Sequence, residues 1–233
     1  MSAESTFAGF PKDAVAFLRE LAAHNEKSWF DANKARFEES VMAPARDFVV
    51  AMGERLRSIA PGINADPRVN GSIFRINRDV RFSKDKRPYK NHVGVWFWDG
   101  PGPKMERPGF YFHLEPPKLM LGGGIHGFGK PLLTSYREAA VHPVSGPALT
   151  GVVAEVGQRF DIGEQHYKRV PTGYDAGHPN AELLRFSGLT AIRQTPIPGD
   201  LYSGDLVEHC FEVFEAMLPL HVWLRELADR AAS

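Results

Sequence analysis

Cysteine, net charge and long apolar runs are what this sequence lacks. Its 233 residues include a single cysteine, Cys210, which excludes an internal disulfide and any zinc site built from several cysteines. No run approaches the roughly 18 apolar residues that a membrane span requires, so no membrane partner is expected. The first ten residues show no basic segment followed by an apolar run, which predicts that no signal peptide is present. Together these absences predict a cytoplasmic protein.

Charge of one sign is also missing. The chain has 28 Lys and Arg residues against 28 Asp and Glu residues, a formal net charge of zero. This balance disfavours a uniformly basic coat for nucleic acid and a polybasic membrane surface. A hydrophobic content of 43% excludes intrinsic disorder. No long linker separates two cores, so residues 1–233 are predicted to form a single domain.

The apolar pattern changes twice along the chain. Helical periodicity dominates the first 60 or so residues, aromatic and β-branched residues punctuated by Gly and Pro dominate the middle, and helical patterns return after Lys130. Helices are predicted over residues 12–24, around Trp29–Val41, from Pro44, over 132–141 and 145–160, over 181–186, and from Ser203 with a break at Pro219. Strands are predicted over residues 72–82, 93–98, 109–115, 118–121 and 189–194. The expected fold class is α+β, with a central antiparallel sheet flanked by N-terminal and C-terminal helices.

The zero net charge conceals a segregation of charge. Residues 68–90 contain eight basic and two acidic residues, a net charge of +6, whereas residues 200–233 contain two basic and seven acidic residues, a net charge of −5. One interpretation is structural: the acidic C-terminal helix, with Glu208, Glu212 and Glu215, covers the basic strand, and the arginines bind no ligand.

A second interpretation is an anion-binding site. On an extended strand over residues 72–82, Arg75, Asp79 and Arg81 point to one face, and Arg78 points to the apolar side. The planar guanidinium group matches a carboxylate or a phosphate. Asp79 either orients the arginines or serves as a general base.

The segment that follows is rich in hydrogen-bond donors. Lys86, Tyr89 and Lys90 would extend the anion site, with Tyr89 as a stacking surface. His92 lies directly after them and is the better histidine for proton transfer, because of its position.

The basic segment resembles a family signature. The run from Arg75 to Lys90, Arg-Ile-Asn-Arg-Asp-Val-Arg-Phe-Ser-Lys-Asp-Lys-Arg-Pro-Tyr-Lys, is similar to that of a mainly bacterial family, domain of unknown function 2461. Segments around Phe17–Leu21, Trp29–Phe30, Leu121–Gly124, Gly173–Tyr174, His178–Pro179 and Leu183–Leu184 resemble the same family. The resemblance implies no activity. It implies the positions to test first, namely Arg75, Arg78, Asp79, Arg81, Phe82, Asp85, Lys86 and Tyr89.

Metal and nucleotide sites receive less support. On the strand over residues 109–115, His113 and Glu115 share a face and could bind a metal ion together with His92 or His126. No His-x-x-x-His spacing accompanies them, so a polar sheet face is favoured, with no metal and no cofactor. The run Gly122–Gly127 fits the dinucleotide-binding pattern Gly-x-Gly-x-x-Gly, but no helix follows it directly. The run Gly124–Lys130 approaches the phosphate-binding loop Gly-x-x-x-x-Gly-Lys, but Pro131 stands where that loop needs Ser or Thr. A wide glycine turn is favoured instead.

These patterns lead to one preferred function and two alternatives. The preferred one is binding of a small molecule that carries a phosphate or a carboxylate, through Arg75, Arg78, Arg81, Lys86, Tyr89 and Lys90. If a reaction follows, Asp79 or His92 transfers the proton, and whether the protein is an enzyme stays open. The alternatives are a non-catalytic module for nucleic acid or an acidic partner, with nucleic acid less favoured, and a structural charge network without a ligand.

Overall fold

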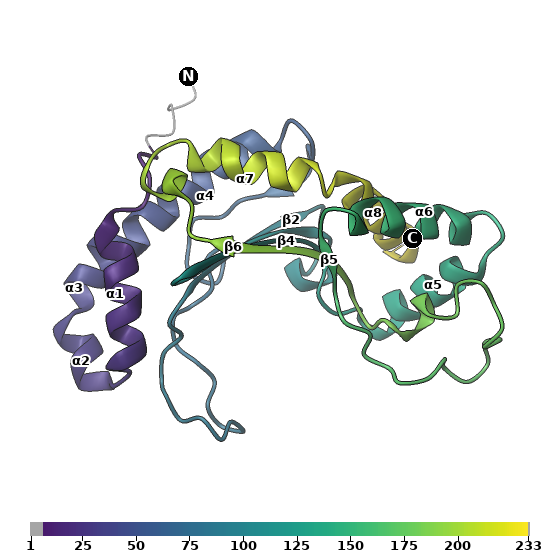
Figure 1. Ribbon diagram of the computed structural model, residues 1–233, viewed down its shortest axis with the longest axis horizontal. Helices are drawn as coiled ribbons and strands as arrows, with labels where there is room; N and C mark the ends of the chain where they lie inside the picture. Colours follow the sequence, from purple (N-terminus) through teal and green to yellow (C-terminus); the bar gives the residue numbers. More distant parts are fainter. Residues whose placement is uncertain (1–6, 233) are drawn as a thin grey trace. The chain divides into compact units, whose positions relative to one another are not determined.

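A computed structural model of the protein (Figure 1) describes residues 7–232. The first six residues, which belong to the segment examined for a signal peptide, lie outside the described residues. The described chain has the predicted α+β class, with helices at both ends and an antiparallel sheet in the strand order β1-β2-β3-β4-β6-β5.

Groups of helices and groups of strands alternate along the described chain. The α-helices are α1 (Lys12–Ala23), α2 (Lys27–Ala32), α3 (Lys34–Phe37), α4 (Ala43–Leu56), α5 (Lys130–Val141), α6 (Ser145–Gly157), α7 (Leu206–Glu215) and α8 (Leu218–Ala232). The strands are β1 (Ile63–Asn64), β2 (Val93–Asp99), β3 (Gly109–Glu115), β4 (Lys118–Ile125), β5 (Asp161–Ile162) and β6 (Leu189–Pro196). A π-helical turn over Glu38–Met42 joins α3 to α4. In the segment predicted as a helix over residues 181–186, only a 3-10 turn forms, over Leu183–Arg185.

Contacts between residues divide the described chain into two compact units. The first holds residues 7–97, 111–121 and 194–213, and the second holds residues 98–110, 122–193 and 214–232. The strands β2, β3, β4 and β6 contribute residues to both units. That the whole chain is a single domain stays a prediction.

The N-terminal helices of the first unit follow the predicted apolar stripe. Phe17, Leu18 and Leu21 of α1 are almost completely buried, as their spacing predicts. Helix α4 has a proline in its first turn, as predicted for Pro44, because a proline there removes no helical hydrogen bond.

The two faces of β3 differ in character. In the first unit, the ring of Phe112 lies 4.7 Å from that of Phe48 on α4 and 6.0 Å from that of Phe10. Because side chains alternate along a strand, Tyr111, His113 and Glu115 point to the opposite face. This alternation places three polar side chains together, each of them partly exposed.

The first part of the glycine-rich segment forms a strand, so the predicted glycine turn is wrong for Gly122–Gly124, whereas His126 and Gly127 form a bend after the strand. Gly122–Gly124 belong to β4, and helix α5 begins only at Lys130. A Cβ atom on Gly124 would lie 2.2 Å from the carbonyl oxygen of Leu189 in the second unit. The glycines therefore allow two segments of backbone to approach closely.

The C-terminal helical segment is divided as Pro219 predicts. Helix α7 ends at Glu215 and α8 begins at Leu218, with Pro219 in its first turn. Cys210 is fully buried, which raises the pKa of its thiol, so it behaves as a small apolar side chain. None of the described helices combines the length and the apolar character needed to cross a bilayer.

Candidate functional site

The basic segment before β2 is an irregular loop, so the predicted strand over residues 72–82 is wrong. Ile73 forms an isolated bridge with Val95, and Asn77 forms one with Tyr89. Residues 79–87 pair with no strand, and Figure 1 shows this part of the chain as a long loop that leaves the strands and returns to β2. We call residues 75–90 the basic loop. Without a regular strand, there is no flat face that presents Arg75, Asp79 and Arg81 side by side.

The physical reason is a local turn that recurs three times as Asp-x-Arg. In each one, the aspartate accepts hydrogen bonds from the backbone N–H and the guanidinium group of the arginine two residues later. The three pairs are Asp66 with Arg68, Asp79 with Arg81, and Asp85 with Arg87. Aspartate side chains that bind the backbone in this way compete with strand pairing.

Three of the predicted anion-binding cations are used within the basic loop itself. Arg78 forms an ion pair with Asp85 at 2.8 Å and donates to the carbonyl oxygen of Arg87 at 3.0 Å. Arg81 pairs with Asp79 at 2.7 Å, and the Nζ atom of Lys86 donates to the carbonyl oxygen of Val80 at 2.9 Å. These three side chains brace the loop.

Asp79 is poorly suited to accept a proton. Hydrogen bonds from the side chain and the backbone of Arg81 lower the pKa of its carboxyl group, and the nearby charge of Arg75 lowers it further. A carboxylate with a lowered pKa is a weak base at neutral pH.

Tyr89 anchors the end of the basic loop. Its side chain is buried, and its ring lies 4.2 Å from that of Phe30 in a stacked arrangement. Its backbone N–H and C=O groups both bond to the side chain of Asn25, each at 3.0 Å. The stacking surface predicted for a ligand is therefore occupied by the protein's own Phe30.

Arg75 and Lys90 remain as a pair of cations, which we call the basic pair. Within residues 7–232, neither side chain forms an ion pair. The ammonium group of Lys90 lies 5.5 Å from the centre of the Phe74 ring. Burial lowers the pKa of Lys90, and the positive charge of Arg75 adds to this effect. The two cations are thus close enough to repel each other.

His92 lies beside the polar face of β3. Its ring centre is 4.1 Å from that of His113. His113 Nε2 lies 3.2 Å from Glu115 Oε2, and the Tyr111 hydroxyl lies 3.0 Å from His113 Nδ1. Asn91 donates from Nδ2 to Glu115 Oε1 at 2.8 Å. We call His92, His113 and Glu115, with their partners Tyr111 and Asn91, the His92 cluster.

Burial sets the protonation of the His92 cluster. It lowers the pKa of His92 to about 4, and the charge of His113 acts in the same direction. For Glu115, burial acts to raise the pKa, but hydrogen bonds from His113 and Asn91 outweigh it and the net shift is downward. Burial also raises the pKa of Tyr111 to about 12. At neutral pH His92 is therefore a neutral imidazole next to a carboxylate.

Sequence reasoning found part of this cluster. The period of two along β3 predicts that His113 and Glu115 share a face, and the structure confirms it. The structure groups His92 with them and leaves out His126, which is exposed in the second unit. The same alternation places Tyr111 on this face, but nothing in the sequence indicates its contact with His113. No local sequence signal points to Asn91.

The predicted bridge from the basic segment to the acidic C-terminal helix is wrong for the arginines of the loop. Arg78, Arg81 and Arg87 all pair with aspartates of the loop. Glu208 pairs instead with Arg55 of α4, at 2.6 Å. Charges two residues apart meet more readily than charges separated by more than a hundred residues, because less chain has to be ordered.

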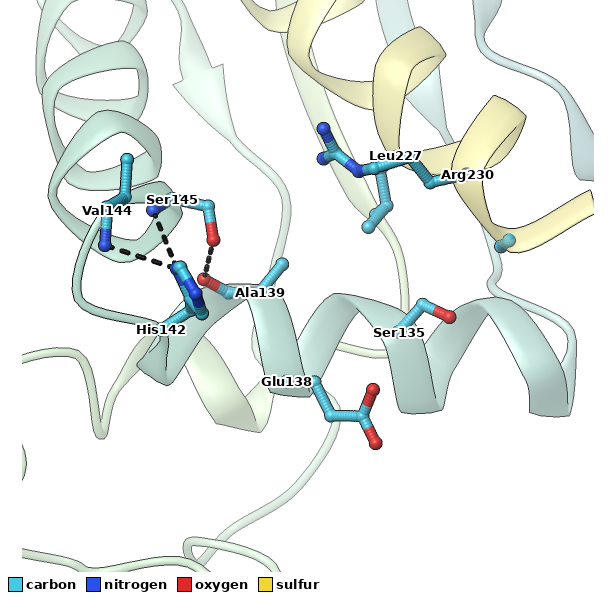
Figure 2. A pocket seen from close by; sticks show the side chains of 9 residues that line it. Ser135, Glu138, Ala139, His142, Val144, Ser145, Leu227 and Arg230 are labelled. Carbon is cyan, nitrogen blue, oxygen red and sulfur yellow. Dashed lines mark hydrogen bonds between the residues drawn. The ribbon is translucent and has the colours of Figure 1, made fainter. Parts of the chain in front are cut away.

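A cavity in the second unit contains none of the predicted site residues. It has a volume of about 490 Å³ and is lined by α5, α8 and the start of α6. Figure 2 shows that its histidine, His142, is already engaged, since its Nδ1 accepts hydrogen bonds from the backbone N–H groups of Val144 and Ser145. The remaining lining offers Glu138 and Arg230 at the wall but no cluster of reactive groups.

Fold and site together define an α+β protein with a polar, histidine-containing cluster beside a basic loop. The chain belongs to the family described as conserved hypothetical protein, DUF2461, whose model matches residues 13–223. A search of curated proteins and a search of solved structures each returned no match.

Proposed function

We propose that this protein binds a small anionic molecule, carrying a phosphate or a carboxylate, at the basic pair beside the His92 cluster. The observation that supports this proposal is that Arg75 and Lys90 lie near each other with no ion pair of their own in the described chain. The charge of Arg75 acts on Asp79, but the carboxylate of Asp79 accepts its side-chain hydrogen bonds from Arg81.

Electrostatics favour an anion at this place. Two cations held together destabilise each other, more so where one is partly buried and water screens less. An anion bound between them removes that repulsion. The guanidinium fork of Arg75 matches two oxygens of a phosphate or carboxylate, while Lys90 acts as a point charge.

The His92 cluster supplies the chemistry next to the anion. The charge of Lys90 contributes to the lowered pKa of His92, so the two side chains lie within electrostatic reach of each other. A neutral imidazole offers a lone pair, which a proton or a metal ion can accept. Both candidate bases are weak at neutral pH, because the pKa of His92 is lowered to about 4 and that of Asp79 is lowered as well.

Calorimetry with inorganic phosphate tests the proposal. The double variant Arg75→Met/Lys90→Met should bind phosphate at least about 10-fold more weakly than the wild type, because hydrogen bonds to charged groups contribute about 1.5–3 kcal/mol each. Lys84→Met, which removes one exposed cation of the same loop, is the matched control and should change affinity less than about 2-fold.

Acetate and chloride titrations show which chemistry is recognised. Binding of acetate but not chloride would extend the proposal to carboxylates. The proposal is overturned if the wild type binds neither phosphate nor acetate, or if the double variant and Lys84→Met weaken binding equally, since that result indicates a diffuse charge effect.

One observation favours a second candidate, a module for single-stranded nucleic acid. The side chain of Phe82 in the basic loop is 96% exposed, next to Arg81, whose guanidinium carbon is 5.9 Å from the ring centre. An exposed ring among cations offers a surface on which a base can stack.

A further inference from the structure

The His92 cluster has a donor set that the proposed anion site does not use. One ligand atom each from His92, His113 and Glu115 lies within 4.8 Å of the other two. We propose that these three side chains bind a divalent transition-metal ion of the zinc type. This inference goes beyond anion binding and stands without it.

The donor set selects the class of metal. Two imidazole nitrogens and one carboxylate oxygen suit Zn²⁺ and its first-row neighbours, whereas Mg²⁺ and Ca²⁺ prefer oxygen ligands alone. With three ligands from the protein, a tetrahedral ion keeps one position for water or for another molecule, as zinc ions in catalytic sites do. The side chain of His113 is 14% exposed and that of Glu115 is 45% exposed, so solvent reaches the cluster.

The partners around the cluster are those that a metal site uses to orient its ligands. The Tyr111 hydroxyl lies at His113 Nδ1, and Asn91 holds Glu115 Oε1. These contacts leave His113 Nε2 and Glu115 Oε2 facing each other at 3.2 Å. A metal ion at Nε2 would require the imidazole proton on Nδ1, where the Tyr111 oxygen could accept it. Histidine ligands are commonly fixed by such a partner on the second nitrogen.

The backbone supplies two of the ligands from one strand and the third from the residue before the neighbouring strand. His113 and Glu115 are two residues apart on β3, so the strand alone directs both to one face. His92 directly precedes β2, the neighbour of β3 in the sheet. Ligands on a strand are held more rigidly than ligands on a loop, so the two ligands from β3 lose less entropy when the metal binds.

An anion at the basic pair can occupy the open coordination position of the metal. Lys90 precedes His92 by two residues, so an anion held by Lys90 and Arg75 lies near the metal and can supply its fourth ligand. This last step rests on the proposed function, whereas the metal site itself does not.

Calorimetric titration of the full-length, chelator-stripped protein with zinc chloride tests the site. We expect one zinc ion per chain, and weakening of zinc affinity by at least about 10-fold in both His113→Ala and Glu115→Gln. His126→Ala removes an exposed histidine outside the cluster and should leave zinc affinity unchanged. Cobalt(II) absorption should show the same pattern and report a four-coordinate ion.

Tyr111→Phe separates a built site from chance chelation. It removes one hydroxyl and keeps the ring, and it should weaken zinc binding by about 10-fold through the lost orientation of His113. Circular dichroism and thermal melting confirm folding, and Glu115→Gln and Tyr111→Phe stay informative if His113→Ala does not fold.

The proposal is overturned if the wild type binds no zinc, or if His113→Ala, Glu115→Gln and Tyr111→Phe bind it as the wild type does. A loss of zinc only in His126→Ala would assign the binding to the surface and would equally reject the site. Failure of the anion site is recognised separately, because Arg75→Met/Lys90→Met should lose phosphate and keep zinc.

Discussion

Asp79 and His92, the two candidate residues for proton transfer, lie in opposite surroundings. Asp79 is exposed and held ionised by Arg81, whereas His92 is partly buried and held neutral. Residue type alone does not separate them, because both can accept a proton in a suitable environment. The difference arises from which charged partner lies nearby and how much water is excluded.

The lowered pKa of His92 predicts a specific pH dependence. In metal-free protein, its imidazole should titrate near pH 4 in histidine NMR spectra, compared with 6.5 when unperturbed. Because the folded-state pKa lies below the unfolded-state value, the unfolded chain binds the proton first as pH falls. The free energy of unfolding should therefore decrease between about pH 6.5 and pH 4. Titration of this histidine near its unperturbed pKa would contradict the prediction.

His92→Gln is the control for stability. It removes the titrating group, so the decrease in the free energy of unfolding over that pH interval should become shallower than in the wild type.

At the scale of elements, the sequence predicts the regular helices and strands, but it does not predict the basic loop or the glycine segment of β4. Strand β3 has the predicted bounds of residues 109–115, and α1 ends within one residue of its prediction. The basic loop is irregular where a strand was predicted, and Gly122–Gly124 form a strand where a turn was predicted. Alternation of apolar residues suggested a strand where Asp-x-Arg turns prevail, and glycines suggested a turn where two backbones pack closely.

Substitution of Gly124 tests whether this part of β4 needs glycine for close backbone packing. Its φ is +124°, and an added Cβ would lie 2.2 Å from the Leu189 carbonyl oxygen. Gly124→Ala should reduce the free energy of unfolding by about 3 kcal/mol, through steric overlap and the strained φ. Gly127→Ala, where nothing lies within 4 Å of the added atom, should cost less than about 1 kcal/mol in the same denaturant titration. Equal effects of the two substitutions would contradict close backbone packing as the reason for Gly124.

At the scale of the whole molecule, charge is balanced overall and concentrated locally. The net charge is zero, while residues 68–90 carry +6. That value already counts Asp79 and Asp85, which pair with Arg78, Arg81 and Arg87 in the basic loop. Three of the arginines therefore have partners within the loop, which favours a small anion at the basic pair over a long polyanion.

Binding of single-stranded nucleic acid tests whether the concentrated positive charge of the basic loop recognises a polyanion. If the second candidate function holds, a fluorescent oligothymidine should bind at low salt, weaken steeply as salt rises, and bind about 10-fold more weakly to Phe82→Ala. Phosphate affinity should be unchanged in that variant, because Phe82 lies outside the basic pair. We expect no oligothymidine binding above about 0.15 M salt, and tight binding there would favour the nucleic-acid module over the small-anion site.

The sequence by itself determined the α+β class, the family, the bounds of several helices and strands, and the shared face of His113 and Glu115. These features depend on residues close together in the chain, whose periodicity is written in the sequence. Only the tertiary structure decided that His92 joins His113 and Glu115, that Tyr89 stacks on Phe30, and that Arg78 and Arg81 brace their own loop while Arg75 and Lys90 do not. Those contacts depend on strand neighbours, burial and competition among partners, which are set when distant segments pack together.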